Sequence, residues 1–183
     1  MDSGESARLF LALWPDAETR ARLRTAQAQV AQVMAGQWAR ADNLHITLAF
    51  LGQIGRERWP LIAEVARSVS APEFILTLDH AEFWPRNGIV CLAASQPPRP
   101  LLDLAEDLAR RLSAAGFSLD SRPYRAHLTL ARKGRSAQWS LALSEPVSWR
   151  LDAFGLIESR PSREGSVYTV RQSWPLQDQP FSC

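Results

Sequence analysis

The spacing of hydrophobic and polar positions divides the chain into segments of two kinds. Apolar residues recur at helical spacing in some segments and form short apolar or alternating runs in others. The helical spacing predicts helices over 15–34, 58–69 and 101–116, with Asp16 as N-cap of the first and Gly116 ending the last. The other runs predict strands over 8–14, 43–52, 73–84, 88–95, 124–132, 147–159 and 166–176.

The order of these elements repeats along the chain. In each half, a helix precedes a strand that carries the letters His-x-Thr-Leu-Ala, and further strands follow. The proline-rich stretch 95–100 separates the two halves. We therefore predict a duplicated α+β fold, a single bilobal domain over 1–183 with approximate halves 7–95 and 96–176 that are free to exchange strands. Two mainly antiparallel sheets with flanking helices would then surround a central cleft.

Composition excludes several classes of protein. The 183-residue chain is 46% hydrophobic and 22% charged, as is ordinary for globular proteins. We expect no membrane association, because no apolar run reaches the roughly 18–20 residues of a membrane helix and no secretory signal is recognisable. Cys91 and Cys183 make no disulfide framework, which favours the reducing cytoplasm. A net charge of +2 argues against a protein that coats long duplexes but permits a small anionic site, and we expect a monomer.

The repeated motif is the strongest candidate for chemistry. The letters HITLAF begin at His45, and HLTLAR begins 82 residues later at His127. Residues two apart on a strand share a face, so His45 projects with Thr47, and His127 projects with Thr129. Two such pairs meeting across one gap would hold two imidazoles and two hydroxyls around a small anion. That arrangement suits displacement at phosphorus, in which one imidazole activates the nucleophile and the other protonates the leaving oxygen.

Other interpretations of these histidines explain less. A single histidine in a strand is more often structural, but a duplicated core would retain apolar letters more readily than His and Thr twice. The chain has only three histidines, and the motif offers no second ligand at the spacing of a zinc site, so we predict neither a metal nor another cofactor. His80 has no partner motif, and we expect it to be structural or exposed.

Three stretches, RLFLAL, DNLHITLAFLG and RPYRAHLTLAR, make the chain similar to the 2H phosphoesterase superfamily. It most resembles the RNA 2′,3′-cyclic phosphodiesterases, also called the LigT-like or 2′-5′ RNA ligase family. The resemblance implies a bilobal fold with pseudo-two-fold symmetry and hydrolysis of a terminal 2′,3′-cyclic phosphate to a 2′-phosphomonoester. It further implies that His45 is the proton donor, that His127 is the proton acceptor, and that Thr47 and Thr129 bind phosphate.

The resemblance extends to four further residues. Arg132 stands where the family commonly has a basic residue that could contact phosphate, and Trp84 and Phe50 are candidates to stack on a base. Tyr124 is a candidate to line the cleft and stack there. Strict alternation would place Arg132 and Phe50 on the face opposite the histidines, so both reach the site only if their strands end or bulge.

The sequence leaves the substrate open. The expected partners are RNA 3′ ends or nucleotides that bear a 2′,3′-cyclic phosphate. The same two imidazoles could instead open small cyclic nucleotides, or cleave or join 2′-5′ linkages. An RNA-end binding module with an idle histidine pair is an alternative of a different class.

Overall fold

The protein consists of three α-helices around an antiparallel sheet within the residues that the computed structural model describes, 6–163 and 165–177. Cys183 lies outside those residues. The helices are α1 (Ala17–Ala31), α2 (Trp59–Ser68) and α3 (Arg99–Ala114), with 3₁₀ turns at Ala41–Asn43 and Arg56–Arg58. The strands are β1 (Ser6–Leu13), β2 (Gln37–Trp38), β3 (Ile46–Gly55), β4 (Phe74–Trp84), β5 (Ile89–Ala93), β6 (Leu128–Arg132), β7 (Ser140–Leu151), β8 (Ala153–Ser162) and β9 (Gly165–Pro175).

The helix ends agree with the signals in the sequence. Asp16 caps α1, where its Oδ1 accepts a hydrogen bond from the Thr19 amide at 2.7 Å. Gly116 follows α3 with φ +79°, a conformation that glycine adopts without the strain a Cβ would introduce. The predicted helices are therefore confirmed to within a few residues at their ends.

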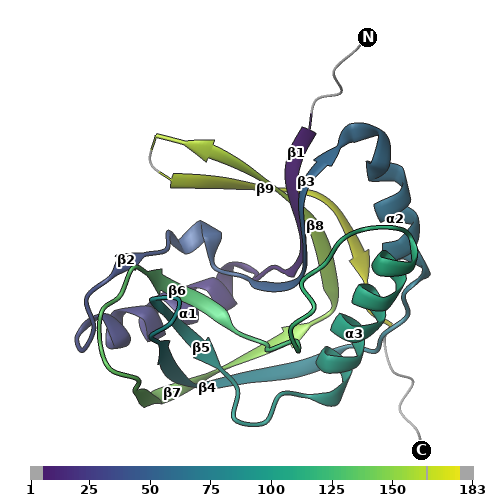
Figure 1. Ribbon diagram of the computed structural model, residues 1–183. Helices are drawn as coiled ribbons and strands as arrows, with labels where there is room; N and C mark the ends of the chain where they lie inside the picture. Colours follow the sequence, from purple (N-terminus) through teal and green to yellow (C-terminus); the bar gives the residue numbers. More distant parts are fainter. Residues whose placement is uncertain (1–5, 164, 178–183) are drawn as a thin grey trace, which may run out of the picture.

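The strands form one continuous sheet in the order β7-β4-β5-β6-β3-β1-β8-β9, with β2 paired to β6 (Figure 1). The predicted α+β class with mainly antiparallel strands is confirmed, but the two predicted sheets are hydrogen-bonded into one. Each motif strand is the inner edge of its own four-strand half, and the halves join where β3 pairs with β6. A single register pair, Ile46 opposite Leu128, makes this junction.

The predicted strand 147–159 is wrong, because two strands occupy it. Strand β7 ends at Leu151 and pairs with β4, whereas β8 begins at Ala153 and pairs with β1 in the other half of the sheet. Apolar residues alternate before exposed Asp152 and are nearly continuous over 153–157 after it, and the break carries no Gly or Pro. The stretch therefore resembles one strand, and its local pattern cannot show that the chain changes partners. Strand β7 also begins seven residues earlier than predicted, at Ser140, and the two-residue strand β2 was not predicted.

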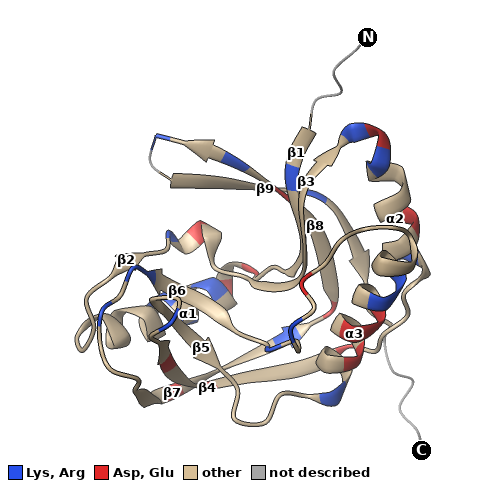
Figure 2. Cartoon of the chain, viewed as in Figure 1, with Lys and Arg blue, Asp and Glu red and all other residues tan. Residues whose placement is uncertain are grey.

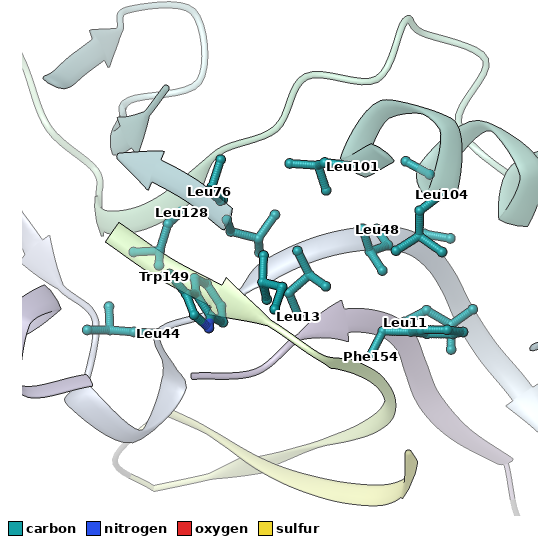
Figure 3. Packing of buried hydrophobic residues seen from close by; sticks show 14 of the residues in the cluster. Leu11, Leu13, Leu44, Leu48, Leu76, Leu101, Leu104, Leu128, Trp149 and Phe154 are labelled. Atoms are coloured by element: carbon teal, nitrogen blue, oxygen red, sulfur yellow. The ribbon is translucent and has the colours of Figure 1, made fainter. Parts of the chain in front are cut away.

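A continuous core unites both halves of the sheet (Figure 3). Helix α3 packs against β3 and α2, and α1 packs against β7, so a helix from the first half of the chain covers a strand from the second. Alternate residues of the motif strands point into this core and are fully buried, as at Ile46 and Leu128. Burial of each such side chain contributes about 1.5–3 kcal/mol, which anchors the motif strands and fixes which residues face the other way.

Candidate functional site

The two His-x-Thr motifs lie side by side on one face of the sheet. Because Ile46 and Leu128 pair and both point into the core, their neighbours His45, Thr47, His127 and Thr129 project from the opposite face, here called the motif face. Antiparallel pairing sets each histidine diagonally across from the other. Residues in such diagonal positions are about 7–8 Å apart. Side chains of this length can reach a common phosphate from both strands.

Both imidazoles are oriented by the same local hydrogen bond. Each histidine lies immediately before its strand, and its Nδ1 donates to the carbonyl oxygen two residues earlier. The distance is 2.6 Å from His45 to Asn43 O and 2.8 Å from His127 to Arg125 O. A proton held on Nδ1 leaves Nε2 as the nitrogen that exchanges protons with a substrate. The repeat in sequence is therefore also a repeat in tautomer and ring orientation.

Matching β-bulges resolve the geometric objection to Arg132 and Phe50. Leu48 has no partner in the register of β3 with β1, and Leu130 has none in the register of β6 with β5. Each leucine stands three residues after its histidine and is buried, as is the alanine that follows. An extra residue reverses the alternation, so the fifth residue after each histidine returns to the motif face.

The consequences differ between the two strands. Phe50 is 45% exposed and carries the guanidinium of Arg8 over its ring at 4.9 Å, so it is not a core residue. The charge of Arg132 lowers the pKa of both His45 and His127, which places this cation within electrostatic reach of the two imidazoles.

Three aromatic side chains surround the imidazole of His45. Trp14 lies parallel to it with ring centroids 5.5 Å apart, Phe10 lies at 4.9 Å, and Tyr168 meets it edge-on at 5.3 Å. Burial lowers the pKa of His45 to about 4, the carbonyl of Asn43 opposes that shift, and nearby positive charge adds to it. His45 is therefore neutral at pH 7 when no anion is bound.

The surroundings of His127 are more polar. Trp84 packs on its ring with centroids 4.6 Å apart. Burial is the main cause that lowers the pKa of His127, and the carbonyl of Arg125 and the carboxylate of Glu82 oppose it. Trp84, a candidate from the sequence, is thus in contact with one of the two histidines.

Tyr124, three residues before His127, links the second motif to the first by a hydrogen bond. Its hydroxyl donates to the carbonyl of Thr47 at 3.2 Å, across 77 positions of sequence. Burial raises the pKa of this hydroxyl well above its ordinary value, so it stays protonated and remains a donor. The contact ties the segment before β6 to β3 at the junction of the two half-sheets.

Several residues of the site carry no sequence signal. Phe10 and Trp14 belong to an apolar run that predicts a strand buried on both faces, and Tyr168 lies about 120 positions from His45 in a strand of mixed polarity. They share a small cluster on the motif face with Ala12 and Ile157. Only the alternation of Leu9, Leu11 and Leu13 with Phe10, Ala12 and Trp14 could have hinted that one face of β1 lines a site.

The third histidine lies apart from this site. His80 bonds through Nδ1 to its neighbour Asp79 at 2.6 Å, and Asp79 also accepts the amide of Ser95. This half-buried cluster closes the end of the β4–β5 hairpin, in agreement with a structural role. Cys91 is fully buried within β5, opposite Thr129 of β6, and this burial raises the pKa of its thiol to about 12.

The described part of the chain contains no group of three or more His, Cys, Asp or Glu side chains that could hold a metal ion. None of its helices is long and apolar enough to cross a membrane. A cavity of about 320 Å³ adjoins Trp14 beside Arg150 and Asp152, but none of the four motif residues lines it. Basic residues occur on β1, at β2–β6 and on the β8–β9 hairpin, whereas α3 carries both signs (Figure 2).

The site therefore consists of two oriented imidazoles on one face of an α+β sheet, each followed by a threonine on the same face. The family model of the 2′-5′ RNA ligase superfamily matches residues 10–163, and the chain belongs to that superfamily. The predicted resemblance is thereby confirmed.

Named relatives and solved structures agree with this assignment. The chain is 35% identical over 180 residues to the RNA 2′,3′-cyclic phosphodiesterase of Escherichia coli (strain K12), and the match covers 94% of this chain and 98% of the relative. It is 27% identical over 181 residues to the RNA 2′,3′-cyclic phosphodiesterase of Thermus thermophilus, where the match covers 94% and 91%. The crystal structure of E. coli LigT complexed with 3′-AMP superposes with a TM-score of 0.88 at 34% identity, covering 95% of this chain and 100% of that one.

Proposed function

We propose that this chain hydrolyses the terminal 2′,3′-cyclic phosphodiester of RNA to a 2′-phosphomonoester by acid–base catalysis with two histidines and no metal. The observation that carries the proposal is the Ile46–Leu128 pair, which sets both His-x-Thr motifs on one face with both Nε2 atoms left for the substrate. The names of relatives that match nearly the whole chain support the choice of substrate.

The proposed reaction uses the two imidazoles in opposite protonation states. Neutral His127 takes a proton from water through Nε2 as the water oxygen bonds to phosphorus. Protonated His45 gives its Nε2 proton to the 3′ oxygen as the bond from phosphorus to that oxygen breaks. The products are a 2′-phosphomonoester and a 3′-hydroxyl, and proton exchange with solvent restores both histidines. General acid–base catalysis of this kind contributes about 10²–10⁴-fold.

The donor role requires substrate binding to change the protonation of His45. In the free chain, burial holds the pKa of His45 at about 4, so its imidazole is mostly neutral at pH 7. A bound phosphate brings a negative charge next to the ring and raises that pKa. We therefore propose that the substrate anion and the proton bind together, which makes the acid available only when there is a leaving group to protonate.

The remaining candidates have supporting roles in this proposal. Thr47 and Thr129 donate hydroxyl hydrogen bonds to non-bridging phosphate oxygens, and Arg132 neutralises their charge. Phe50 is exposed enough to stack on a base. Trp84 and Tyr124 bound the site next to His127 and Thr47, respectively, where each adjoins the terminal nucleoside.

Replacement of the histidines tests the proposal. His45→Ala and His127→Ala should each lose at least about 100-fold in kcat on a short RNA with a 2′,3′-cyclic end. His80→Ala is the matched control, since it removes the histidine that lies outside both motifs and bonds to Asp79, and it should retain activity. Near-normal turnover in both motif variants would refute the two-histidine reaction.

The product decides the direction of bond breaking. A 2′-phosphate supports His45 as donor to the 3′ oxygen, and a 3′-phosphate would reverse the assigned leaving oxygen. Parallel assays with nucleoside 2′,3′-cyclic phosphates and 2′-5′-linked dinucleotides separate RNA ends from small cyclic nucleotides and 2′-5′ linkages. Binding of the cyclic RNA end without any turnover would identify an idle binding module.

The oligomeric state and the cellular compartment follow from the site and from the cysteine content. We propose that the chain acts as a monomer, because the motifs of one chain complete the site. We also propose that it acts in the cytoplasm, because a chain with two cysteines does not depend on disulfides and so needs no oxidising compartment.

A further inference from the structure

Arg125 makes three separate contacts around the second motif. Its Nη2 lies 2.7 and 2.6 Å from the two carboxylate oxygens of Glu82. Its guanidinium carbon lies 4.6 Å from the centroid of the Trp84 ring. Its carbonyl oxygen accepts the hydrogen bond from Nδ1 of His127. Arg125 thus contacts both the Trp84 ring that packs on His127 and the Nδ1 atom of His127 itself.

The carboxylate of Glu82 is the buried partner of the ion pair with Arg125. The side chain of Glu82 is only 13% exposed, whereas that of Arg125 is 61% exposed. Removal of the arginine would leave a largely buried carboxylate without its cation, which is unfavourable. Glu82 and Trp84 stand two residues apart on β4, so they share a face and present the ion pair and the indole together.

We propose that Arg125 and Glu82 are a positioning pair that clamps Trp84 against the His127 imidazole and holds that ring in its reacting orientation. This inference rests on the proposed two-histidine function. Arg125 acts through Trp84 and through its own carbonyl rather than on the reacting atoms, so it is a positioning residue. The first motif has no equivalent, because three aromatic rings hold His45 instead.

The pair also sets the charge that His127 experiences. Four charged or titratable groups act in this region: Arg125 before β6, Glu82 on β4, Arg132 on β6 and His45 before β3. The cations of Arg125 and Arg132 lower the pKa of His127, and Glu82 raises it. His45 and His127 also repel each other when both are protonated. Neutralising Arg125 should therefore raise the pKa of His127, and neutralising Glu82 should lower it.

The experiment begins with the titration of His127 in the absence of substrate. The Cε1–H resonances of the three histidines are assigned with His45→Ala and His80→Ala and followed by NMR against pH. Arg125→Met should raise the pKa of His127 by about half a unit or more, and Glu82→Gln should lower it by a similar amount. Arg99→Met, which breaks an exposed ion pair with Asp103 on α3, is the control and should leave the titration unchanged.

Kinetics then separate charge from geometry. Arg125→Lys keeps the cation but loses the planar stack on Trp84, so the His127 pKa should hold while kcat falls about two- to fivefold and KM changes little. In Arg125→Met, one limb of the pH profile of kcat/KM should move with the measured pKa: the acidic limb if His127 is the base, the basic limb if it is the acid.

The outcomes distinguish this inference from the proposed function. If Arg125→Met and Glu82→Gln, both folded by thermal unfolding, left the His127 titration unmoved, the positioning pair would be refuted whatever the activity. Unchanged kcat in Arg125→Lys would refute the clamp on Trp84. An inactive wild-type chain with the expected opposite pKa shifts would instead refute the proposed reaction and leave the pair intact.

Discussion

The buried imidazole of His45 should make the chain less stable in acid, by an amount that follows from its environment. In the folded chain, burial holds the pKa of His45 at about 4, against an ordinary value of 6.5. Between these two values, the unfolded chain binds a proton that the folded chain does not. The free energy of unfolding must therefore fall as pH drops from about 6.5 towards 4. Linkage gives a loss of about 2 kcal/mol at pH 5 and about 3 kcal/mol at pH 4.

His45→Gln isolates this contribution, because the other titrating groups remain. Urea denaturation at several pH values from 7 to 4 gives the free energy of unfolding of both proteins. The wild type should lose about 3 kcal/mol more than His45→Gln across that range, and most of the difference should develop below pH 6. At pH 7, any difference reflects the packing of glutamine among the three aromatic rings and the change in the hydrogen bond to the carbonyl of Asn43.

The result that would refute this reasoning is a pair of parallel stability curves. They would mean that His45 titrates alike in the folded and unfolded chain, and that the rings of Phe10, Trp14 and Tyr168 do not exclude water from it. The same result would remove the need for proton uptake with the substrate. That uptake can be measured independently by calorimetry of product binding in two buffers with different enthalpies of ionisation.

Three further predictions concern the surrounding groups. Tyr124→Phe should lower the free energy of unfolding by about 1 kcal/mol and Tm by about 2–4 °C, measured by thermal denaturation. Tyr168→Phe is a second hydroxyl deletion for comparison, and an unchanged Tm in Tyr124→Phe would show that the hydrogen bond to Thr47 contributes nothing to stability. Arg132→Met should reduce kcat/KM about 10- to 100-fold and raise the pKa of His45, and equal kinetics would exclude a phosphate contact. Activity should persist in EDTA, and its loss with rescue by a divalent ion would demand a metal mechanism.

The parts of the fold that depend on neighbours in sequence were predictable. Helix α1 follows from the spacing of Leu23, Ala26 and Val30 and from the Asp16 cap, and α3 ends where Gly116 allows a left-handed turn. Strand β7 and strand β8 were not separable, because apolar residues flank Asp152 on both sides and no Gly or Pro marks the break. Which strand lies beside which is set by packing over long sequence distances, and periodicity carries no such information.

The candidate site shows the same division. His45 and His127 were identifiable because a motif repeated within one chain is improbable by chance, and so were Thr47 and Thr129 by their spacing. The sequence did not predict that Arg132 and Phe50 lie on the motif face, since strict alternation would place both on the opposite face. A one-residue bulge in each strand reverses that conclusion, and no letter in the motif marks it.

The sequence by itself determined the duplicated unit, its helices and most strands, and the side chains that carry the proposed chemistry, because each depends on residues within a few positions of one another. Only the tertiary structure decided that the motif strands pair at Ile46 and Leu128, that aromatic rings enclose His45, and that Arg125 and Glu82 brace the ring beside His127. These contacts join residues about 30 to 120 positions apart, so they arise from the packing of buried leucines on the other side of the sheet. That packing leaves one arrangement in which both imidazoles share a face.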